Sequence, residues 1–456
     1  MAFAGCTTEP ERDLAAASQV PSADRQQVPV IIIPGMLGSR LFDRVTGVEA
    51  WPGTRRKLLT SGYLELAFQI DPATLEPLDD GLVPGGLFDR AVVRDFYGRI
   101  VRALQEVGYR RAQPGQPALR GEARLYIFTY DWRQDMVRSA QKLDELIEQI
   151  RRDYGDPELR VDVVAHSMGG MIVRYYQRYG AADELDGNAF LVTGAGARKL
   201  RRVALIGTPN LGSVSAIHSF LDGRRVALSR LVTEGVATMP AMYEFFPSPQ
   251  VAWIANTRGE ALDLDVFDVK VWRHLGWSVF SRDAQRRMAS DPAIWPSQEV
   301  FERYFEKRLK RAQRFVWSLD VPAGGVELVK PLLLGSDCIP TAARLVLEEE
   351  DGALVARRLP EQIRNPVPGV DYEKLMFEPG DSLVTASSVR GLRERDPPAL
   401  PQELAGTELE NTFFVCTLHD QLSSNRQLLD HLLHFLLEPG GRTPAAQGRA
   451  TLAPAT

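Results

Sequence analysis

Val161-Asp162-Val163-Val164-Ala165-His166-Ser167-Met168-Gly169-Gly170 carries the strongest structural signal in this chain. An apolar run of strand length ends at a serine that has a small residue two positions away on either side, and apolar residues with helical spacing follow immediately. This order is typical of a nucleophile elbow, the tight strand-to-helix turn that exposes a serine hydroxyl at the top of a parallel sheet. Ala165 stands where the strict Gly-x-Ser-x-Gly pattern has its first glycine. The stretch predicts that Ser167 is a catalytic nucleophile; the alternative is a buried serine in an ordinary strand–turn–helix.

Strand and helix patterns alternate on both sides of this elbow. Apolar runs predict strands at residues 29–33, 125–130, 203–206, 330–334, 343–348 and 413–417, and helical spacing predicts helices at 92–107, 137–152 and 422–437. Alternation of this kind indicates an α/β fold, with a mostly parallel sheet and helices on both of its faces.

The alternation is interrupted between residues 216 and 328, where five of the seven tryptophans lie. We expect this segment to be an inserted helical cap or lid, whose aromatic side chains either pack as a core or line an acyl-chain site. The stretch 300–314 has a basic amphipathic pattern, which fits either a docked helix or contact with an anionic lipid surface. The expected division is a disordered tail at 1–27, a core at 28–215 with a lid-like excursion at 42–90, the insertion at 216–328, a second core part at 329–437 and a disordered tail at 438–456.

The composition is that of a soluble globular protein, with 456 residues of which 44% are hydrophobic and 25% charged. A formal net charge of −5 gives no electrostatic case for binding nucleic acid. No apolar run approaches the roughly 18 residues that a membrane-spanning helix needs. The three cysteines, Cys6, Cys338 and Cys416, lie far apart and are expected to form neither a disulfide framework nor a metal site.

The first residues allow two interpretations of the compartment. Met1 to Cys6 ends like the lipid-attachment box of a bacterial lipoprotein, but the charged start and the apolar stretch of roughly 7–15 residues that an export signal needs are absent. With Met1 as the start we expect a cytoplasmic protein; the alternative is an exported lipoprotein whose true start lies upstream of Cys6.

A serine nucleophile needs an acid and a base, which on this fold follow it in the order Ser, Asp or Glu, His. His419 comes directly after the strand predicted at 413–417, at the carboxyl end where α/β sites assemble. Asp381 and Asp337 both follow glycine-containing turns, and Asp381 is preferred because a loop and a short helix separate it from His419. Its carboxylate would hold the imidazole in the tautomer that accepts the serine proton.

Acyl transfer also needs two N–H groups placed to stabilise an oxyanion. The amide of Met168, at the start of the helix that follows the nucleophile, is predicted to be the first. The second is predicted to be the amide of Met36, in a loop where Gly35 and Gly38 permit backbone angles that other residues resist.

Six stretches occur in the order that they have in one known family: Val30–Ser39, Tyr130–Arg133, Ala165–Gly170, Gly207–Ser213, Gly380–Val384 and His419. Because of these stretches, the chain resembles the lecithin:cholesterol acyltransferase family over residues from about 28 to 437. This family includes lysosomal-type phospholipases and phospholipid:diacylglycerol acyltransferases. The resemblance implies an α/β-hydrolase fold and cleavage of a lipid acyl ester through an acyl-enzyme. It also implies the triad Ser167, Asp381 and His419, with oxyanion amides at Met36 and Met168; Leu37 and Trp51 are further candidates for substrate contact.

The leading prediction is a serine-dependent lipid acyl-ester hydrolase or O-acyltransferase that acts on phospholipids or acylglycerols. The residues do not distinguish water from an alcohol as the acyl acceptor. An esterase for small or polymeric esters is the alternative, and an inactive lipid-binding protein is the third interpretation. No metal, organic cofactor or nucleic acid is expected; the expected partners are the acyl-ester substrate and a lipid surface that the cap contacts.

Overall fold

The computed structural model describes residues 28–438, apart from 55, 92–93, 120–121, 188, 227–228, 392–402 and 405–406. The predicted tails, except Glu438, and the lipid-attachment hypothesis for Cys6 therefore lie outside the described residues. Within the described ranges, no helix combines the length and the apolar character that crossing a membrane requires.

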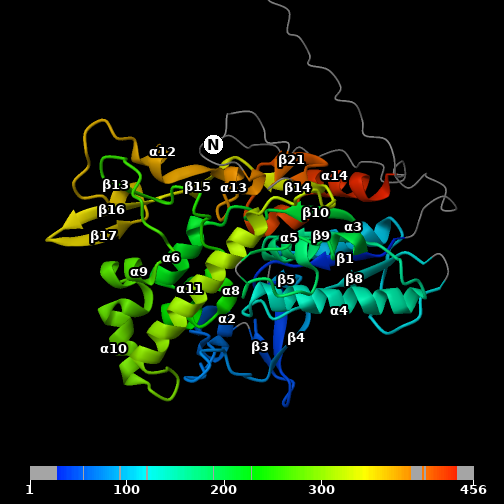
Figure 1. Cartoon of the computed structure of the whole chain (residues 1–456), viewed down its shortest axis with the longest axis horizontal. Coiled ribbons are helices and arrows are strands. Elements are labelled where there is room, and N and C mark those ends of the chain that lie inside the picture. The colour runs from blue at the N-terminus through cyan, green and yellow to red at the C-terminus, as the bar shows by residue number, and fades with distance from the viewer. Residues whose placement is uncertain are drawn as a thin grey trace, which may run out of the picture.

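A seven-stranded sheet, in which every neighbouring pair of strands is parallel, forms the centre of the molecule (Figure 1). Its strands in spatial order are β21 (Asn411–Val415), β14 (Pro331–Ser336), β10 (Leu200–Ile206), β9 (Val161–His166), β1 (Val30–Ile33), β8 (Arg124–Ile127) and β7 (Arg110–Arg111). The mostly parallel sheet expected from the alternating patterns is confirmed.

Different helices cover the two faces of this sheet. One face holds α4 (Met136–Tyr154) and α5 (Met168–Tyr179), and the other holds α3 (Gly98–Glu106) and α14 (Arg426–Leu437). Side chains alternate between the faces along a strand. On β1, Ile31 belongs to the buried cluster with α4 and α5, whereas Val30 and Ile32 belong to the cluster with α3 and α14. The uninterrupted apolar sequence of β1 therefore reflects burial on both sides.

Smaller elements surround this core. Between β1 and α3 lie β2 (Ser39–Asp43), β3 (Glu49–Trp51), α2 (Lys57–Thr60), η1 (Leu64–Leu66), β4 (Leu82–Leu87), β5 (Arg90–Ala91) and β6 (Arg94–Asp95). After β14 lie β15 (Ile339–Ala342), β16 (Leu345–Glu350), β17 (Ala353–Arg357), η4 (Pro360–Gln362), α12 (Tyr372–Met376), β18 (Phe377–Gly380), α13 (Ala386–Arg390), β19 (Glu403–Leu404), β20 (Thr407–Glu408) and, beyond β21, η5 (His419–Ser424).

Two of these elements differ from the sequence-based expectation. The helix expected at 92–107 begins only at Gly98, because β5 and β6 pair with each other just before it. The strand expected at 343–348 is β16, which pairs with β17 and with a strand of the insertion rather than with the central sheet. An apolar run indicates a buried strand, but it does not identify the sheet that the strand joins.

A mainly helical insertion separates β10, which follows η2 (Ala197–Lys199), from β14. It comprises α6 (Val214–Asp222), β11 (Arg224–Val226), β12 (Ser229–Leu231), α7 (Thr233–Ala237), α8 (Pro240–Tyr243), β13 (Ile254–Asn256), α9 (Val269–Leu275), η3 (Ser278–Phe280), α10 (Arg282–Ser290) and α11 (Gln298–Asp320). In Figure 1, α9 and α10 lie to one side of the central sheet. The expected helical insertion is confirmed.

Aromatic side chains form the core of this insertion. The ring of Phe220 lies 4.7 Å from that of Tyr243 and 4.9 Å from that of Phe246, measured between centroids. Trp272 stacks on Phe246 at 5.3 Å and meets the edge of Phe305 at the same distance. All five side chains are buried. These five aromatic side chains therefore stabilise the insertion instead of lining a binding site.

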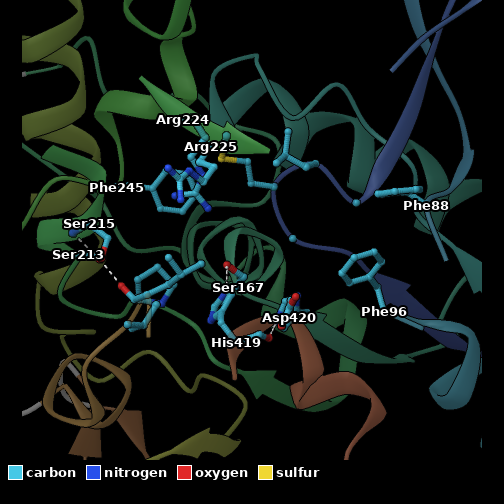
Figure 2. A pocket seen from close by; sticks show the side chains of 18 of the residues that line it. Phe88, Phe96, Ser167, Ser213, Ser215, Arg224, Arg225, Phe245, His419 and Asp420 are labelled. Atoms are coloured by element: carbon cyan, nitrogen blue, oxygen red, sulfur yellow. Dashed lines mark hydrogen bonds between the residues drawn. The ribbon is translucent and has the colours of Figure 1, made fainter. Parts of the chain in front are cut away.

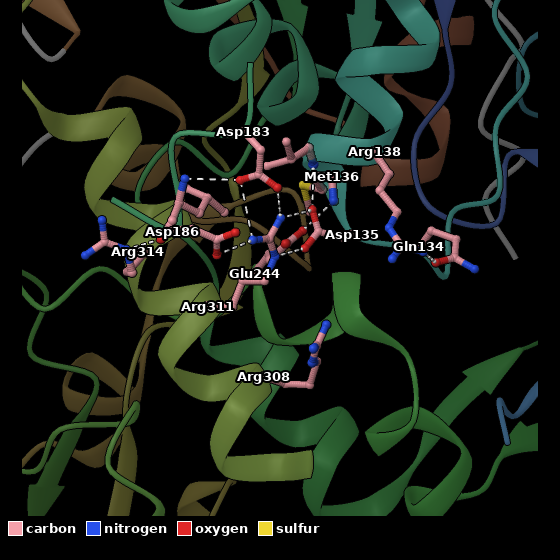
Figure 3. Close-up of polar contacts among 12 residues, drawn as sticks. Gln134, Asp135, Met136, Arg138, Asp183, Asp186, Glu244, Arg308, Arg311 and Arg314 are labelled. Atoms are coloured by element: carbon pink, nitrogen blue, oxygen red, sulfur yellow. Dashed lines mark hydrogen bonds and ion pairs between the residues drawn. The ribbon is translucent and has the colours of Figure 1, made fainter. Parts of the chain in front are cut away.

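The basic helix α11 is docked on the rest of the protein by its charges (Figure 3). Arg311 forms ion pairs with Asp183 at 2.8 Å and with Asp135, whose carboxylate also caps α4 by accepting the N–H of Val137 at 2.9 Å. Arg308 pairs with Glu76 at 2.8 Å. These cations are bound within the chain, so the geometry agrees with a docked helix rather than with a lipid-binding face.

A disulfide between Cys338 and Cys416 corrects the expectation that the cysteines form no bond. The two residues are 78 positions apart in sequence, but their Cα atoms lie 5.3 Å apart. They follow β14 and β21, which are neighbouring parallel strands with Ser336 opposite Val415. Because parallel strands end at the same edge of a sheet, the topology brings together two cysteines whose spacing alone gave no indication of pairing.

Replacing both cysteines, Cys338→Ser with Cys416→Ser, is expected to lower the free energy of unfolding by about 2–4 kcal/mol, because the bond restricts the unfolded chain. Urea unfolding followed by tryptophan fluorescence measures the effect. A Cys6→Ser variant, which keeps the bond, is the control. Coincident unfolding curves for the oxidised protein and the double variant would contradict the assigned bond.

Candidate active site

Ser167 occupies the sharp turn between β9 and α5. Its backbone has φ 54° and ψ −119°. Residues other than glycine rarely adopt such a conformation, and where they do it is often at a functional site. The Ser167 N–H donates to the carbonyl oxygen of Ile206 at 2.8 Å, which ties the turn to β10. A Cβ atom on Gly170 would lie 1.9 Å from Oγ1 of Thr208, so the start of α5 can approach the turn after β10 only with glycine there.

The side chains of Ser167, His419 and Asp381 form a continuous hydrogen-bonded row. His419 Nε2 lies 2.9 Å from Ser167 Oγ, and His419 Nδ1 lies 2.7 Å from Asp381 Oδ2. Figure 2 draws Ser167 and His419 side by side. Ser167 follows β9, Asp381 follows β18 and His419 follows β21. With the Asp381 carboxylate ionised, Nδ1 carries the imidazole proton and Nε2 is free to accept the serine proton.

Asp381 is held in its ionised form. Burial alone would raise the pKa of its carboxyl, but the charge and hydrogen bond of His419 and the N–H groups of Val384 and Leu383 outweigh burial and lower that pKa. Val384 and Leu383 donate to Oδ1 at 2.7 and 3.0 Å. The competing candidate, Asp337, instead pairs with Arg390 at 3.0 Å. The structure thus places Asp381, and not Asp337, against the imidazole.

The two predicted oxyanion amides belong to segments that adjoin Ser167. Met168 is the first residue of α5, so the helix leaves its N–H unused and adds a favourable dipole for an anion. Met36 lies in the turn after β1 that a hydrogen bond from Gly38 N to Gly35 O closes at 3.0 Å. A Cβ on Gly35 would lie 2.9 Å from Cβ of Ser167, so glycine is required for this loop to approach the nucleophile.

A cavity of about 880 Å³ opens beside Ser167 and His419 (Figure 2). Leu37 and Trp51, the candidates for substrate contact, both line it, and the Trp51 indole N–H donates to the carbonyl oxygen of Leu37 at 2.9 Å. Its other apolar walls include Leu58, Leu59, Phe88, Phe96, Met242 and Phe245. A cavity of this size and character suits an apolar ligand, since ligand pockets are about 300–1,000 Å³ and mostly apolar.

Sequence reasoning missed a second hydrogen-bonded row behind the nucleophile. The N–H of Gly35 donates to the Tyr97 hydroxyl at 2.8 Å, and that hydroxyl lies 2.8 Å from Nδ1 of His166. His166 Nε2 lies 3.1 Å from the carbonyl oxygen of His419. Since a carbonyl only accepts, Nε2 carries the proton of His166, and Nδ1 accepts from Tyr97. The row connects the oxyanion loop, the elbow and the backbone of His419.

Burial keeps this second row in one protonation state. It lowers the pKa of His166 to about 3, with a further decrease from the charge of His419, and it raises the pKa of Tyr97. A neutral His166 holds its neighbours and does not compete with His419 as a base. In the sequence, His166 is notable only as the neighbour of Ser167, and Tyr97 belongs to no motif. The two side chains meet because α3 packs against the sheet.

A model of the family described as lecithin:cholesterol acyltransferase matches residues 81–321, just over half of the chain. The matched range contains Ser167 and ends before Asp381 and His419. No curated protein sequence matches the chain.

Among solved structures, the Tle4–Tli4 complex contains a chain with a TM-score of 0.51 and 14% identity, and the match covers 90% of this protein and 98% of that chain. The mature lipase BlEst2 of Bacillus licheniformis gives a TM-score of 0.34 at 11% identity, with 91% of this protein and 94% of that chain covered. EstA of Clostridium botulinum gives a TM-score of 0.35 at 12% identity, with 92% of this protein and 90% of that chain covered. Together with the parallel sheet and the elbow, the first likeness confirms the expected α/β-hydrolase fold.

Replacing the acid, Asp381→Asn, is expected to lower kcat roughly 10⁴-fold, because an amide at this place favours the wrong tautomer of His419. Initial rates on a chromogenic acyl ester measure the loss. The matched control is Asp337→Asn, which removes a carboxylate paired with Arg390 away from the imidazole and should keep most of the activity. The reverse ranking of the two variants would transfer the role to Asp337.

Removing one hydroxyl, Tyr97→Phe, is expected to lower kcat roughly ten- to a hundred-fold with little change in KM, because it leaves the Gly35 N–H and His166 Nδ1 without their partner. Steady-state kinetics separate the two constants. Tyr154→Phe is the control, since it removes a partly buried hydroxyl that donates to the Glu122 carbonyl at 2.8 Å. Equal kcat values for both variants would show that the row is only structural.

Proposed function

The chain belongs to the lecithin:cholesterol acyltransferase family, and we propose that it is a serine-dependent lipid acyl-ester hydrolase or O-acyltransferase that works through an acyl-enzyme. One observation carries this proposal: Ser167 Oγ lies 2.9 Å from His419 Nε2 at the wall of the large apolar cavity. The nucleophile is within reach of its base, and the adjacent space accepts an acyl chain.

In the first half of the reaction, Ser167 Oγ attacks the ester carbonyl carbon while His419 Nε2 takes the serine proton. The carbonyl oxygen becomes an oxyanion, which the N–H groups of Met36 and Met168 stabilise. As the tetrahedral intermediate collapses, the bond to the alcohol breaks and His419 donates the proton to the departing oxygen. Asp381 remains ionised and stabilises the imidazolium throughout.

In the second half, an acceptor hydroxyl replaces the departed alcohol. His419 removes its proton, the acceptor oxygen attacks the acyl-enzyme carbonyl, and the second tetrahedral intermediate uses the same two amides. Its collapse returns the proton to Ser167 Oγ. Water as the acceptor gives a fatty acid, and an alcohol gives a new ester.

The character of the cavity supports a lipid as the acyl donor. Its walls near the nucleophile are aliphatic and aromatic, and an apolar acyl chain gains about 0.8 kcal/mol for each CH₂ group that is buried. Phospholipids and acylglycerols both carry such chains. A small ester such as an acetate would leave most of the cavity without contact, which disfavours the esterase alternative.

The disulfide also bears on where the protein acts. Disulfides persist in oxidising compartments and are rare in the reducing cytosol. The bond between Cys338 and Cys416 therefore favours an exported protein over the cytoplasmic expectation.

Incubating the protein with a labelled long-chain phospholipid, with and without a fatty alcohol, tests the proposed function. We expect labelled fatty acid or a new labelled ester, and neither product from Ser167→Ala. Ser219→Ala, a buried serine whose hydroxyl donates to the Ser215 carbonyl at 3.3 Å, is the control and should retain activity. Cleavage of acetate or butyrate esters alone would establish the esterase alternative. Absence of fluorophosphonate labelling at Ser167 would indicate an inactive lipid-binding protein.

A further inference from the structure

Buried aromatic side chains hold the turn that carries the predicted oxyanion amide of Met36. The first peptide group of this turn joins Pro34 to Gly35, and two tyrosine hydroxyls bind its two polar atoms. The Tyr130 hydroxyl donates to the carbonyl oxygen of Pro34 at 2.7 Å. On the other side of the same peptide group, the N–H of Gly35 donates to the Tyr97 hydroxyl at 2.8 Å. Both tyrosines are buried, so the orientation of this peptide group is fixed.

The last peptide group of the turn, which joins Leu37 to Gly38, is held in the same way. The Trp51 indole N–H donates to the carbonyl oxygen of Leu37 at 2.9 Å. The N–H of Gly38 donates to the carbonyl oxygen of Gly35 at 3.0 Å and closes the turn. Both polar atoms of this second peptide group are therefore bound as well.

Leu37 needs such support because its backbone has φ 66°. It is the third of the four residues in the turn, the place where type II turns require a positive φ and usually have glycine. A residue with a Cβ atom keeps this conformation only where its surroundings impose it. The Trp51 side chain is well fixed for this purpose, since it is only 1% exposed and its ring lies 5.2 Å from Tyr63 and 5.7 Å from Trp132, measured between centroids.

Between these two fixed peptide groups lies the one that joins Gly35 to Met36. Its carbonyl oxygen accepts the bond that closes the turn, whereas the Met36 N–H has no hydrogen-bond partner among the residues that the structure describes. Met36 lines the same cavity as Ser167. A free N–H beside the nucleophile suits an oxyanion, and fixed neighbours keep it in place before charge develops.

We propose that Trp51 and Tyr130 are positioning residues for the oxyanion. By holding the backbone on either side, they keep the Met36 N–H directed at the ester oxygen that becomes anionic. This gives Trp51 a role that needs no contact with the substrate. It also gives a role to Tyr130, in the stretch Tyr130–Arg133 that the triad mechanism leaves unused. The inference rests on the proposed function, because the oxyanion forms only when Ser167 attacks an ester.

Removing one donor at a time tests this role. We expect Trp51→Phe and Tyr130→Phe each to lower kcat roughly tenfold with little change in KM, equally for nitrophenyl butyrate and nitrophenyl octanoate. Trp253→Phe and Tyr243→Phe are the matched controls and should keep the wild-type kcat. They remove donors of buried side chains that bind backbone carbonyl oxygens at 2.9 and 2.6 Å outside the cavity wall. Titration with a fluorophosphonate, followed to completion, corrects each kcat for the amount of folded enzyme.

A second measurement addresses the conformation of Leu37. Glycine adopts a positive φ without the steric cost that a Cβ atom adds, so it should partly replace the support of the indole. In the Trp51→Phe background, we expect the kcat of Leu37→Gly to exceed that of Leu37→Ala roughly five- to tenfold. With Trp51 present, the ratio of these two kcat values should lie closer to one. Both substitutions remove the side chain beyond Cβ, so lost substrate contacts largely cancel in the ratio.

Each contrary result has a distinct meaning. Wild-type kcat in both Trp51→Phe and Tyr130→Phe, or the same glycine-to-alanine ratio in both backgrounds, overturns the positioning role and leaves the proposed function intact. A loss that appears in KM and grows from butyrate to octanoate assigns Trp51 to contact with the acyl chain instead. If Trp51→Phe does not fold, Tyr130→Phe, which removes a single oxygen atom, decides the kinetic test. A wild type that cleaves neither these esters nor a long-chain phospholipid and is not labelled at Ser167 defeats the proposed function and this inference together.

Discussion

The carboxyl edge of the central sheet is the constraint on which the rest of the site depends. Ser167 and His419 are 252 residues apart, yet their side chains share a hydrogen bond because β9 and β21 are parallel strands of one sheet that end at the same edge. The turn after β1 reaches that edge as well and brings Met36 beside the nucleophile. A fully parallel sheet collects residues from distant segments without a long loop to carry them.

Close contacts between backbone segments at this edge then fix how the site residues are oriented. Gly170 lets α5 start directly against the turn after β10, and Gly35 lets the oxyanion loop touch the elbow. The hydrogen bonds through Tyr97 and His166 fix the loop, the elbow and the His419 backbone relative to one another. The resulting rigidity matters chemically, because oxyanion donors are effective only where they are already in place when charge develops.

The insertion contributes part of the wall of the cavity beside Ser167. Its aromatic core and the ion pairs of α11 with Asp135 and Asp183 stabilise it on the sheet domain without using the cavity. Only a few of its residues, including Phe245 and the arginines of β11, reach the cavity wall. Buried aromatic rings therefore stabilise the insertion, and a small number of residues at its edge line the cavity.

Local sequence determined the features that depend on local patterns. The alternation of apolar strands and amphipathic helices predicted the parallel sheet, and the elbow pattern singled out Ser167 because its requirements are confined to a few consecutive residues. The position of His419 followed from its place after a recognisable strand. The sequence also favoured Asp381 over Asp337, and the structure places Asp381 against the imidazole. Tertiary structure alone decided what depends on distant contacts: the bond between Cys338 and Cys416, the separate sheet of β16, the contact of Tyr97 with His166, and the arginines at the cavity. Each of these joins residues whose separation along the chain carries no signal, because their proximity arises only when the strands assemble into one sheet and the insertion packs beside it.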